Sequence, residues 1–406
     1  MIGPGQGHIP ELDGLRGIAC LSIVVSHCIG AILQSTGVLG WPEAIWLTLQ
    51  YFLWGGVDLF FVLSGFLIGR ILIDHRGAQN FFAVFWTRRA ARILPVLFIV
   101  VAAYSLLLAL RPYIGASFLD LWLLKEPTNS PLWYLTFTQT IPMTMSGWGP
   151  QWLAVSWSLA IEEQFYLFFP FLVVLLPPRR LAAVMIAFVV LGPITRGLVH
   201  HYVGWSASYI LLPCRMDCLS MGVLIAIAVR NPGLLARLRE YRRPLDIVTA
   251  GLAVLLVGDN FFVWRDAIKP THPLTADMVY TLSYSVLALF FTLCLLRLFL
   301  HPRGPYHRCL AWKPLTWLGL ISYGLYMYHQ PVNGLVHGLL FRSEPRVGSV
   351  QEFVVALLVM AIAILLSILS YRFIETPIRR MAHRVNLRRS VTSNAEAQAA
   401  PTGTAS

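Results

Sequence analysis

Charged side chains are scarce in this chain. Its 406 residues include 31 Lys and Arg and 19 Asp and Glu, so only 12% are charged, whereas 57% are hydrophobic. In an average soluble domain, roughly a quarter of the residues are charged. The shortage excludes a compact globule with a water-facing surface.

Three further absences narrow the class of protein. Residues Met1–Pro10 contain no Lys or Arg and so lack the basic region of a cleavable signal peptide, and we expect the first span to be retained. Apolar stretches such as Phe353–Leu366 do not alternate with polar residues as the strands of a membrane β-barrel do. The net charge of +12 is not gathered in one basic surface, which argues against nucleic acid as a partner.

Cysteine is also rare, with six residues that lie mostly within apolar stretches. A buried thiol behaves as a small hydrophobe, so we expect no disulfide framework. Cys214 and Cys218 share a helix face, but no set of carboxylate and histidine ligands is spaced beside them. We therefore expect no metal site.

Long apolar stretches recur along nearly the whole chain. A helix needs about 20 apolar residues to cross a bilayer, and the sequence predicts an all-α transmembrane helix bundle. We place about ten spans in this bundle: 15–33, 51–73, 93–110, 152–176, 181–199, 208–229, 245–263, 278–300, 315–340 and 350–374.

The distribution of basic residues orients these spans. With both termini in the cytoplasm, 22 of the 31 Lys and Arg lie at the inner side and 6 in the outer loops. This asymmetry follows the positive-inside rule and predicts a multi-pass protein of the inner (cytoplasmic) membrane, with the lipid bilayer as its first partner.

Two segments stand apart from the spans. The outer loop at 111–151 is rich in Trp, Pro and Thr, and we expect it to lie along the interface or to dip into the bundle as a re-entrant helix. The polar stretch 381–406 is expected to be a disordered cytoplasmic tail, which leaves 1–380 as the transmembrane domain.

Ionisable residues within the spans form the most informative set. Each costs roughly 2.5–3.5 kcal/mol on insertion and therefore calls for a partner or a function. At a rise of about 1.5 Å per residue, they converge on the middle and outer half of the bundle: His27, Asp58, Glu162, Glu163, Arg215, Asp217 and His329. They either hold the helices together by hydrogen bonds or build a site.

A histidine among carboxylates is suited to general-base chemistry, because its reference pKa near 6.5 lets it take up and return a proton at physiological pH. We expect His27 to have this role, with Arg215 as a candidate donor to a developing oxyanion. His329, flanked by Tyr326, could line an acceptor pocket or be a hydrogen-bonded core histidine.

A second basic group precedes the third span. Arg88 and Arg92 are four residues apart and share a helix face, with Arg89 between them. These arginines either anchor the helix end or bind the phosphates of a cytoplasmic donor, since guanidinium groups bind phosphate well.

Seven blocks resemble the membrane acyltransferase 3 family. They occur in family order and cover residues 9 to 380: ELDGLRGIACLSIVVSH, GGVDLFFVLSGFLIGRIL, FWTRRAARILP, WSLAIEEQFYLFFP, CRMDCLSMG, LISYGLYMYHQPV and YRFIETPIRR. In the first block Arg16 and His27 are separated by ten residues, which matches the family's arginine-ten-histidine signature.

The resemblance implies roles for particular residues. His27 would be the catalytic base and Glu162 part of an acid cluster. We add Asp58, Arg215 and Asp217 as further candidate catalytic residues. Four arginines would lie near an acyl-CoA donor: Arg16, Arg88, Arg89 and Arg92. His329, Tyr326 and Trp157 are our candidates for acceptor binding. Some relatives carry an appended hydrolase-like domain, and we expect direct transfer, or a separate partner, in its place.

The sequence thus predicts an O-acyltransferase, specifically an O-acetyltransferase. Its expected co-substrate is acetyl-CoA or another acyl-CoA, with no resident cofactor, and its expected acceptor is an extracytoplasmic carbohydrate, as a glycan or glycolipid. Two alternatives remain open. A relative of the same family could acylate a macrolide-like metabolite, and a secondary transporter would also place charges at the midplane, although no repeat of the histidine block is visible.

Overall fold

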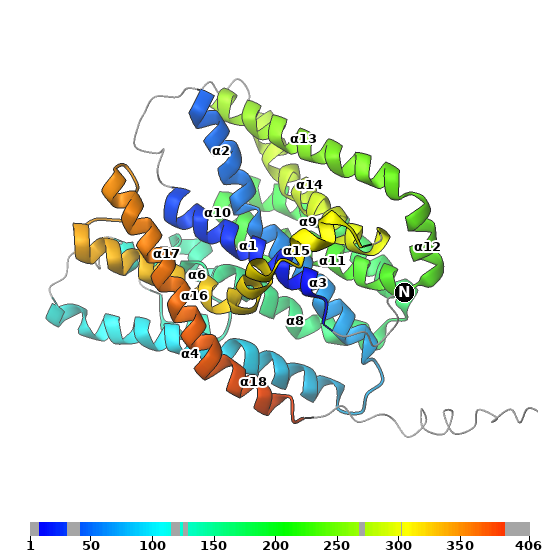
Figure 1. Ribbon diagram of the computed structural model, residues 1–406, viewed down its shortest axis with the longest axis horizontal. Coiled ribbons are helices and arrows are strands. Elements are labelled where there is room, and N and C mark those ends of the chain that lie inside the picture. The colour runs from blue at the N-terminus through cyan, green and yellow to red at the C-terminus, as the bar shows by residue number, and fades with distance from the viewer. Residues whose placement is uncertain are drawn as a thin grey trace, which may run out of the picture.

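A computed structural model describes residues 8–30, 41–114, 122–124, 129–267, 273–301 and 303–385. Within these ranges the chain forms helices and no strand, which confirms the predicted all-α class. Figure 1 shows the helices packed into one bundle.

The long helices have these bounds: α1 (Pro10–Ile29), α2 (Trp41–Trp54), α3 (Gly56–Asp74), α4 (Phe81–Ile114), α8 (Trp157–Leu175), α9 (Pro178–Tyr202), α11 (Met216–Arg230), α13 (Arg242–Ala267), α14 (Pro273–Leu300), α16 (Lys313–Phe341) and α17 (Val350–Ser370). Shorter elements connect them: α5 (Pro131–Leu135), α6 (Thr140–Ser146), α7 (Gln151–Ala154), α10 (Trp205–Ile210), the 3₁₀ turn η3 (Leu212–Cys214), α12 (Pro232–Glu240), α15 (Pro305–Leu310), the π-helical turn η4 (Tyr371–Glu375) and α18 (Thr376–Ala382).

Seven of the described helices are long and apolar enough to cross a membrane. An eighth is added if α11 and α12, which meet at 102°, are counted as one broken span. The chain is therefore a multi-pass membrane protein. Helices α13 and α16, of 26 and 29 residues, are long enough but less apolar, so the number of ten spans stays a prediction.

The predicted span 208–229 is not one continuous helix. Helix α10 ends at Ile210, the turn η3 follows, and α11 begins only at Met216. Pro213 explains the break, because proline disfavours a helical conformation in the residue before it and lacks an N–H for the helix. Arg215 thus stands at a helix N-terminus.

Helices α1 and α16 run parallel and in unusually close contact. A Cβ atom added at Gly17 would lie 2.2 Å from the carbonyl oxygen of Leu315, and one at Gly319 would lie 1.9 Å from that of Asp13. Small residues allow helix backbones to approach in this way. The Sγ of Cys20 donates to the carbonyl of Ser322 at 3.4 Å. Facing residues of α1 and α16 at this point thus differ by 302 in residue number, which defines the register of the two helices.

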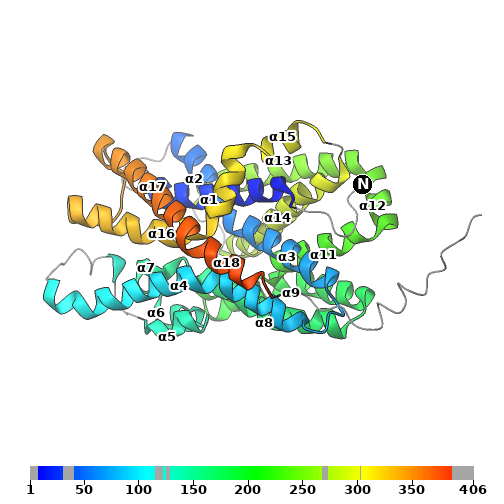
Figure 2. The same cartoon turned by 60° about the horizontal axis from the view of Figure 1, so that its bottom comes forward.

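Two further helices complete the surroundings of α1. Helix α3 packs against α1 and α11, and α18 lies along the N-terminal part of α4 in both views of the bundle (Figures 1 and 2). The N-terminal halves of α1 and α4, and α18, each carry arginines, so this arrangement brings basic residues from distant parts of the sequence to one place.

In its described part the expected re-entrant region at 111–151 contains the end of α4 and two short helices, α5 and α6, and α7 begins at its last residue. Gln139 is buried there, and its Nε2 donates to the carbonyl of Ser156 at 2.8 Å. This segment thus packs into the bundle. Of the predicted tail, residues 386–406 lie outside the described residues.

Candidate functional site

Two histidines from α1 and α16 form a direct contact inside the bundle. The Nδ1 of His27 and the Nε2 of His329 are 2.8 Å apart, and the planes of the two rings are parallel to within 5°, with their centroids 5.1 Å apart. The pair repeats the offset of 302 residues set by Cys20 and Ser322, seven residues further along both helices. The close α1–α16 packing therefore positions the pair.

The partners of His329 decide which nitrogen carries each proton. The Nδ1 of His329 lies 3.2 Å from the carbonyl oxygen of Leu325, which can only accept, so this nitrogen is the protonated one. In the neutral ring the Nε2 of His329 then accepts from the Nδ1–H of His27. The Nε2 of His27 is left with a free lone pair, as a general base requires.

A cavity of about 330 Å³ approaches this pair from the basic side of the bundle. It touches α3 from Val57 to His75, a helical rise of about 27 Å, and so runs along most of a hydrocarbon core about 30 Å thick. At the end of the cavity far from His75, the ring of Tyr326 forms part of the wall, and the centroid of that ring lies 5.8 Å from the centroid of the His329 ring.

Arginines from three helices line the cavity. All four predicted donor-binding residues are among them, together with one that we did not predict: Arg16, Arg88, Arg89, Arg92 and Arg379. The rest of the lining is largely apolar, with Leu63, Leu67 and Phe85 among it. A cavity that combines several arginines with an apolar wall fits a ligand that carries phosphates on one part and a thin apolar chain on another.

The hydroxyl groups at the far end of the cavity are organised around Tyr326. Its hydroxyl is 2.7 Å from the Oγ of Ser158 and donates to the carbonyl of Val155 at 2.9 Å. Tyr326 thus bridges α16 and α8 between the cavity, which it lines, and His329, which it contacts.

His383 lies at the mouth of the same cavity, beyond the last apolar helix. Partial desolvation and the neighbouring charges of Arg88 and Arg379 lower the pKa of this imidazole from its ordinary value. The side chain is therefore neutral at pH 7 and becomes a further cation only in acid.

Glu162 belongs to the donor cavity and contacts neither histidine in the described contacts. Its Oε1 accepts from Ser64 Oγ at 2.7 Å and its Oε2 from Tyr166 at 3.2 Å. The NH2 of Arg89 lies 3.9 Å from Glu162 and 3.5 Å from Glu163, and its guanidinium stacks over Tyr166 at 4.0 Å. The two acids thus balance the charge of a buried arginine.

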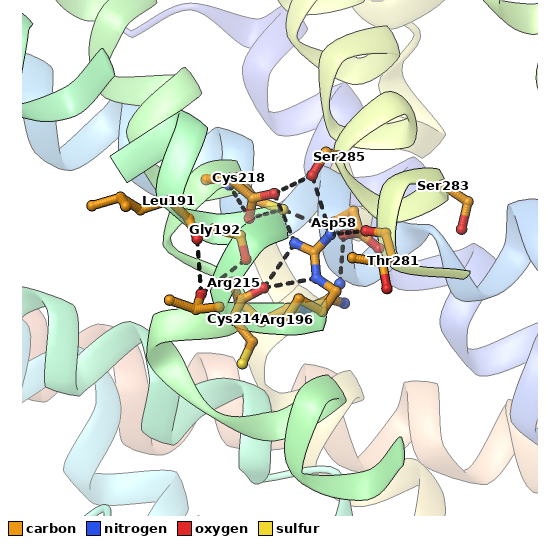
Figure 3. Close-up of polar contacts among 12 residues, drawn as sticks. Asp58, Leu191, Gly192, Arg196, Cys214, Arg215, Cys218, Thr281, Ser283 and Ser285 are labelled. Atoms are coloured by element: carbon orange, nitrogen blue, oxygen red, sulfur yellow. Dashed lines mark hydrogen bonds and ion pairs between the residues drawn. The ribbon is translucent and has the colours of Figure 1, made fainter. Parts of the chain in front are cut away.

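The other predicted acids lie in a separate buried network, shown in Figure 3. Asp217 is bound by Arg196 at 2.7 Å and by Ser285 at 2.6 Å. Asp58 lies 3.3 Å from Arg215. Each cation therefore faces one acid.

Arg215 is enclosed by aromatic rings. Its guanidinium carbon lies 4.6 Å from the ring of Tyr284, 4.8 Å from that of Tyr209 and 6.0 Å from that of Trp157. Trp157 is thus buried beside the cation, and the described contacts place Arg215 with these rings and Asp58 rather than with the histidine pair. The network ties α3, α9, α11 and α14 together.

Sequence reasoning missed two residues of these clusters. Arg196 was visible as a charge inside the span 181–199, but nothing in the sequence indicates that Asp217 is its partner. Arg379 stands in the block YRFIETPIRR after the last apolar stretch, and only the folding of α18 onto α4 brings it to the cavity.

Comparisons with known proteins identify a family. A family model described as "Acyltransferase domain" matches residues 9–372. The O-acetyltransferase OatA of Staphylococcus aureus is 28% identical over 390 residues, which cover 92% of this chain and 57% of that protein. The putative peptidoglycan O-acetyltransferase YrhL of Bacillus subtilis is 31% identical over 403 residues, or 94% and 56% of the two chains.

A third relative is the peptidoglycan O-acetyltransferase OatA of Listeria monocytogenes, which is 27% identical over 398 residues and covers 92% of this chain and 56% of its own. The chain thus spans a little over half the length of these curated relatives. No solved structure matches it.

Proposed function

We propose that this chain, which belongs to the acyltransferase family whose model it matches, is a membrane O-acetyltransferase. The donor is acetyl-CoA or another acyl-CoA that enters from the cytoplasm. The acceptor is a hydroxyl group of an extracytoplasmic carbohydrate. The names of the relatives make peptidoglycan the first candidate.

The observation that carries the proposal is the histidine pair at the end of an arginine-lined cavity. The arginines bind the phosphates of the donor by charge-assisted hydrogen bonds, and the apolar wall holds its acyl-bearing arm. The thioester then lies near Tyr326 and Ser158, the last polar groups before His329.

Transfer proceeds by proton movement through His27. As the acceptor oxygen attacks the thioester carbon, the Nε2 of His27 takes the hydroxyl proton, and His329 stabilises the resulting imidazolium through the Nδ1–Nε2 hydrogen bond. The C–S bond breaks, the new ester C–O bond remains, and the proton passes to the CoA thiolate. Atoms and charge balance without a further reactant.

The buried Arg196–Asp217 and Arg215–Asp58 pairs have a structural role in this proposal. Arg196 is hydrogen-bonded to Asp217, and Arg215 forms an ion pair with Asp58, at the junction of four helices. In this proposal Asp58, Arg215 and Asp217 position α3 and α11, and their predicted catalytic roles stay predictions. Glu162 forms an ion pair with Arg89 in the cavity.

The test uses purified protein in lipid nanodiscs with radiolabelled acetyl-CoA and short peptidoglycan glycan strands as the acceptor probe. We expect label on the glycan that is stable to removal of CoA and sensitive to mild base, as an ester is. A parallel assay offers a macrolide as the acceptor in place of the glycan. Release of CoA without labelled glycan, or label on the macrolide alone, would contradict the proposed carbohydrate acceptor. Inability to bind CoA would contradict the enzyme assignment.

A further inference from the structure

Two amide oxygens next to the histidine pair have no hydrogen-bond donor. The Oδ1 of Asn333 and the Oε1 of Gln330 are buried, and neither accepts a hydrogen bond within the described part of the chain. A buried polar atom without a partner is energetically unfavourable. Two such atoms, three residues apart on one helix, indicate that a donor from outside the chain satisfies them.

Their position relative to the pair is fixed by α16. The Nδ2 of Asn333 donates to the backbone carbonyl of His27 at 3.3 Å, so its amide lies against the residue that we assign as the base. Gln330 follows His329 directly and shares a helix face with Asn333 at a spacing of three residues. The two amides therefore share a face of α16 within about one turn of His329, and Asn333 contacts the backbone of His27.

The two residues lie on the side of the pair away from the arginines. Counted from Lys313, His329 is about 24 Å and Asn333 about 30 Å along α16. The helix starts among the predicted cytoplasmic ends, so Asn333 is close to the outer boundary of the hydrocarbon core. A molecule from the outer side reaches Asn333 before it reaches His27.

A third unpaired group lies on α1. The Oγ of Ser26, which directly precedes His27, is also buried and makes no described hydrogen bond. A hydroxyl can donate or accept. Around His27 there are thus two unpaired acceptors and one group of either kind, on two helices whose relative position is set by close packing.

We infer that Asn333 and Gln330, with Ser26, form a subsite that receives hydroxyl groups of the carbohydrate acceptor. The inference rests on the proposed function. Carboxamide oxygens accept hydrogen bonds from sugar hydroxyls, and a sugar presents several hydroxyls close to the one that reacts. The subsite would hold these neighbours while the reacting hydroxyl faces the Nε2 of His27.

The test separates acceptor binding from the donor reaction. Asn333→Leu and Gln330→Met keep the approximate volume of each side chain and remove the accepting oxygen. Asn333→Leu also removes the Nδ2 donor to the His27 carbonyl, so Gln330→Met, which leaves that contact intact, is the deciding variant. For each variant in nanodiscs we expect the KM for glycan strands to rise about tenfold, since a hydrogen bond to a buried group is lost, while CoA affinity stays at the wild-type value. Gln351→Met, at an exposed amide on the outer end of α17, is the matched control and should change neither quantity.

Three results would overturn the inference. The first is an unchanged KM for the glycan in both variants. The second is a fall in turnover with an unchanged KM, which is expected if the two oxygens bind only water. The third is an equal rise in KM in the Gln351→Met control. Direct binding of glycan strands without donor keeps the two proposals apart. If the wild type binds glycan through Asn333 but transfers nothing, the subsite stands and the proposed reaction fails.

Discussion

Gly319 on α16 lies against the backbone of Asp13 on α1 so closely that a Cβ atom there would be 1.9 Å from the Asp13 carbonyl oxygen. This contact is made ten residues before His329 on the same helix, and it belongs to the interface that aligns His27 with His329. The separation of the two backbones at the glycine thus determines whether the histidines can meet.

We therefore expect Gly319→Val to separate the two helices and to lower activity at least tenfold, because backbone atoms cannot yield to the new side chain as a flexible chain end could. Its thermal unfolding temperature in detergent should also fall. Gly251→Val is the control, since a Cβ at Gly251 meets nothing within 4 Å. A Gly319→Val protein with wild-type turnover would show that the register of α1 and α16 does not control the site.

The arginines of the donor cavity predict a loss of CoA affinity. Arg92→Gln and Arg379→Gln each remove one cation from the cavity, and we expect each to weaken CoA binding about tenfold, in line with charge-assisted hydrogen bonds of roughly 1.5–3 kcal/mol. Calorimetry on purified protein measures this. Arg243→Gln, an exposed arginine outside the cavity, should bind CoA normally. Equal affinity in all three variants would leave the cavity arginines as topological anchors.

The lowered pKa of His383 predicts a pH dependence of donor binding. The imidazole is neutral at pH 7, and acidification below its ordinary value near 6.5 adds a cation at the cavity mouth. Because bound phosphate favours the charged form, CoA affinity should rise about threefold as the pH falls from 7 to 5, a modest gain typical of an exposed charge pair. His383→Gln should lose this rise, and a pH response identical to that of the wild type would refute the assignment.

The charge distribution predicts that the C-terminal tail lies in the cytoplasm, since 22 of the 31 basic residues then lie on the inner side. Ser393→Cys in intact cells should therefore resist a membrane-impermeant thiol reagent and react after the cells are opened. The Ser343→Cys variant, in the predicted outer loop after α16, is the positive control. Labelling of Ser393→Cys before lysis would reverse the topology.

The sequence allowed the all-helical membrane fold and most members of the clusters to be predicted, because a charge in an apolar span is visible without coordinates. The sequence did not allow us to predict which of these residues contact one another. His27 was expected among carboxylates, yet a register offset of 302 residues gives it His329, while Glu162 faces Arg89. The pairing depends on which helix faces meet, and hydropathy that is nearly uniform around a membrane helix carries little information on that.

Proline and glycine explain much of the remaining difference. The break at Pro213 removed Arg215 from the middle of a span, and the packing of Gly17 and Gly319 selected α16 as the partner of α1. Both effects act through the backbone. They are recognisable in the sequence only once the neighbouring helix is known.

The central claim is that His27 is the base and that His329 positions it. It is tested by the turnover number for acetyl transfer, with CoA affinity measured on the same folded samples of His27→Ala, His329→Ala and the control His201→Ala, an exposed histidine at the outer end of α9. We expect a loss of about 10²–10⁴ for His27→Ala, the usual range for a general base, and a loss of about tenfold or more for His329→Ala, with CoA affinity unchanged and the control active. Near-normal turnover of His27→Ala, with CoA still bound, would contradict the mechanism.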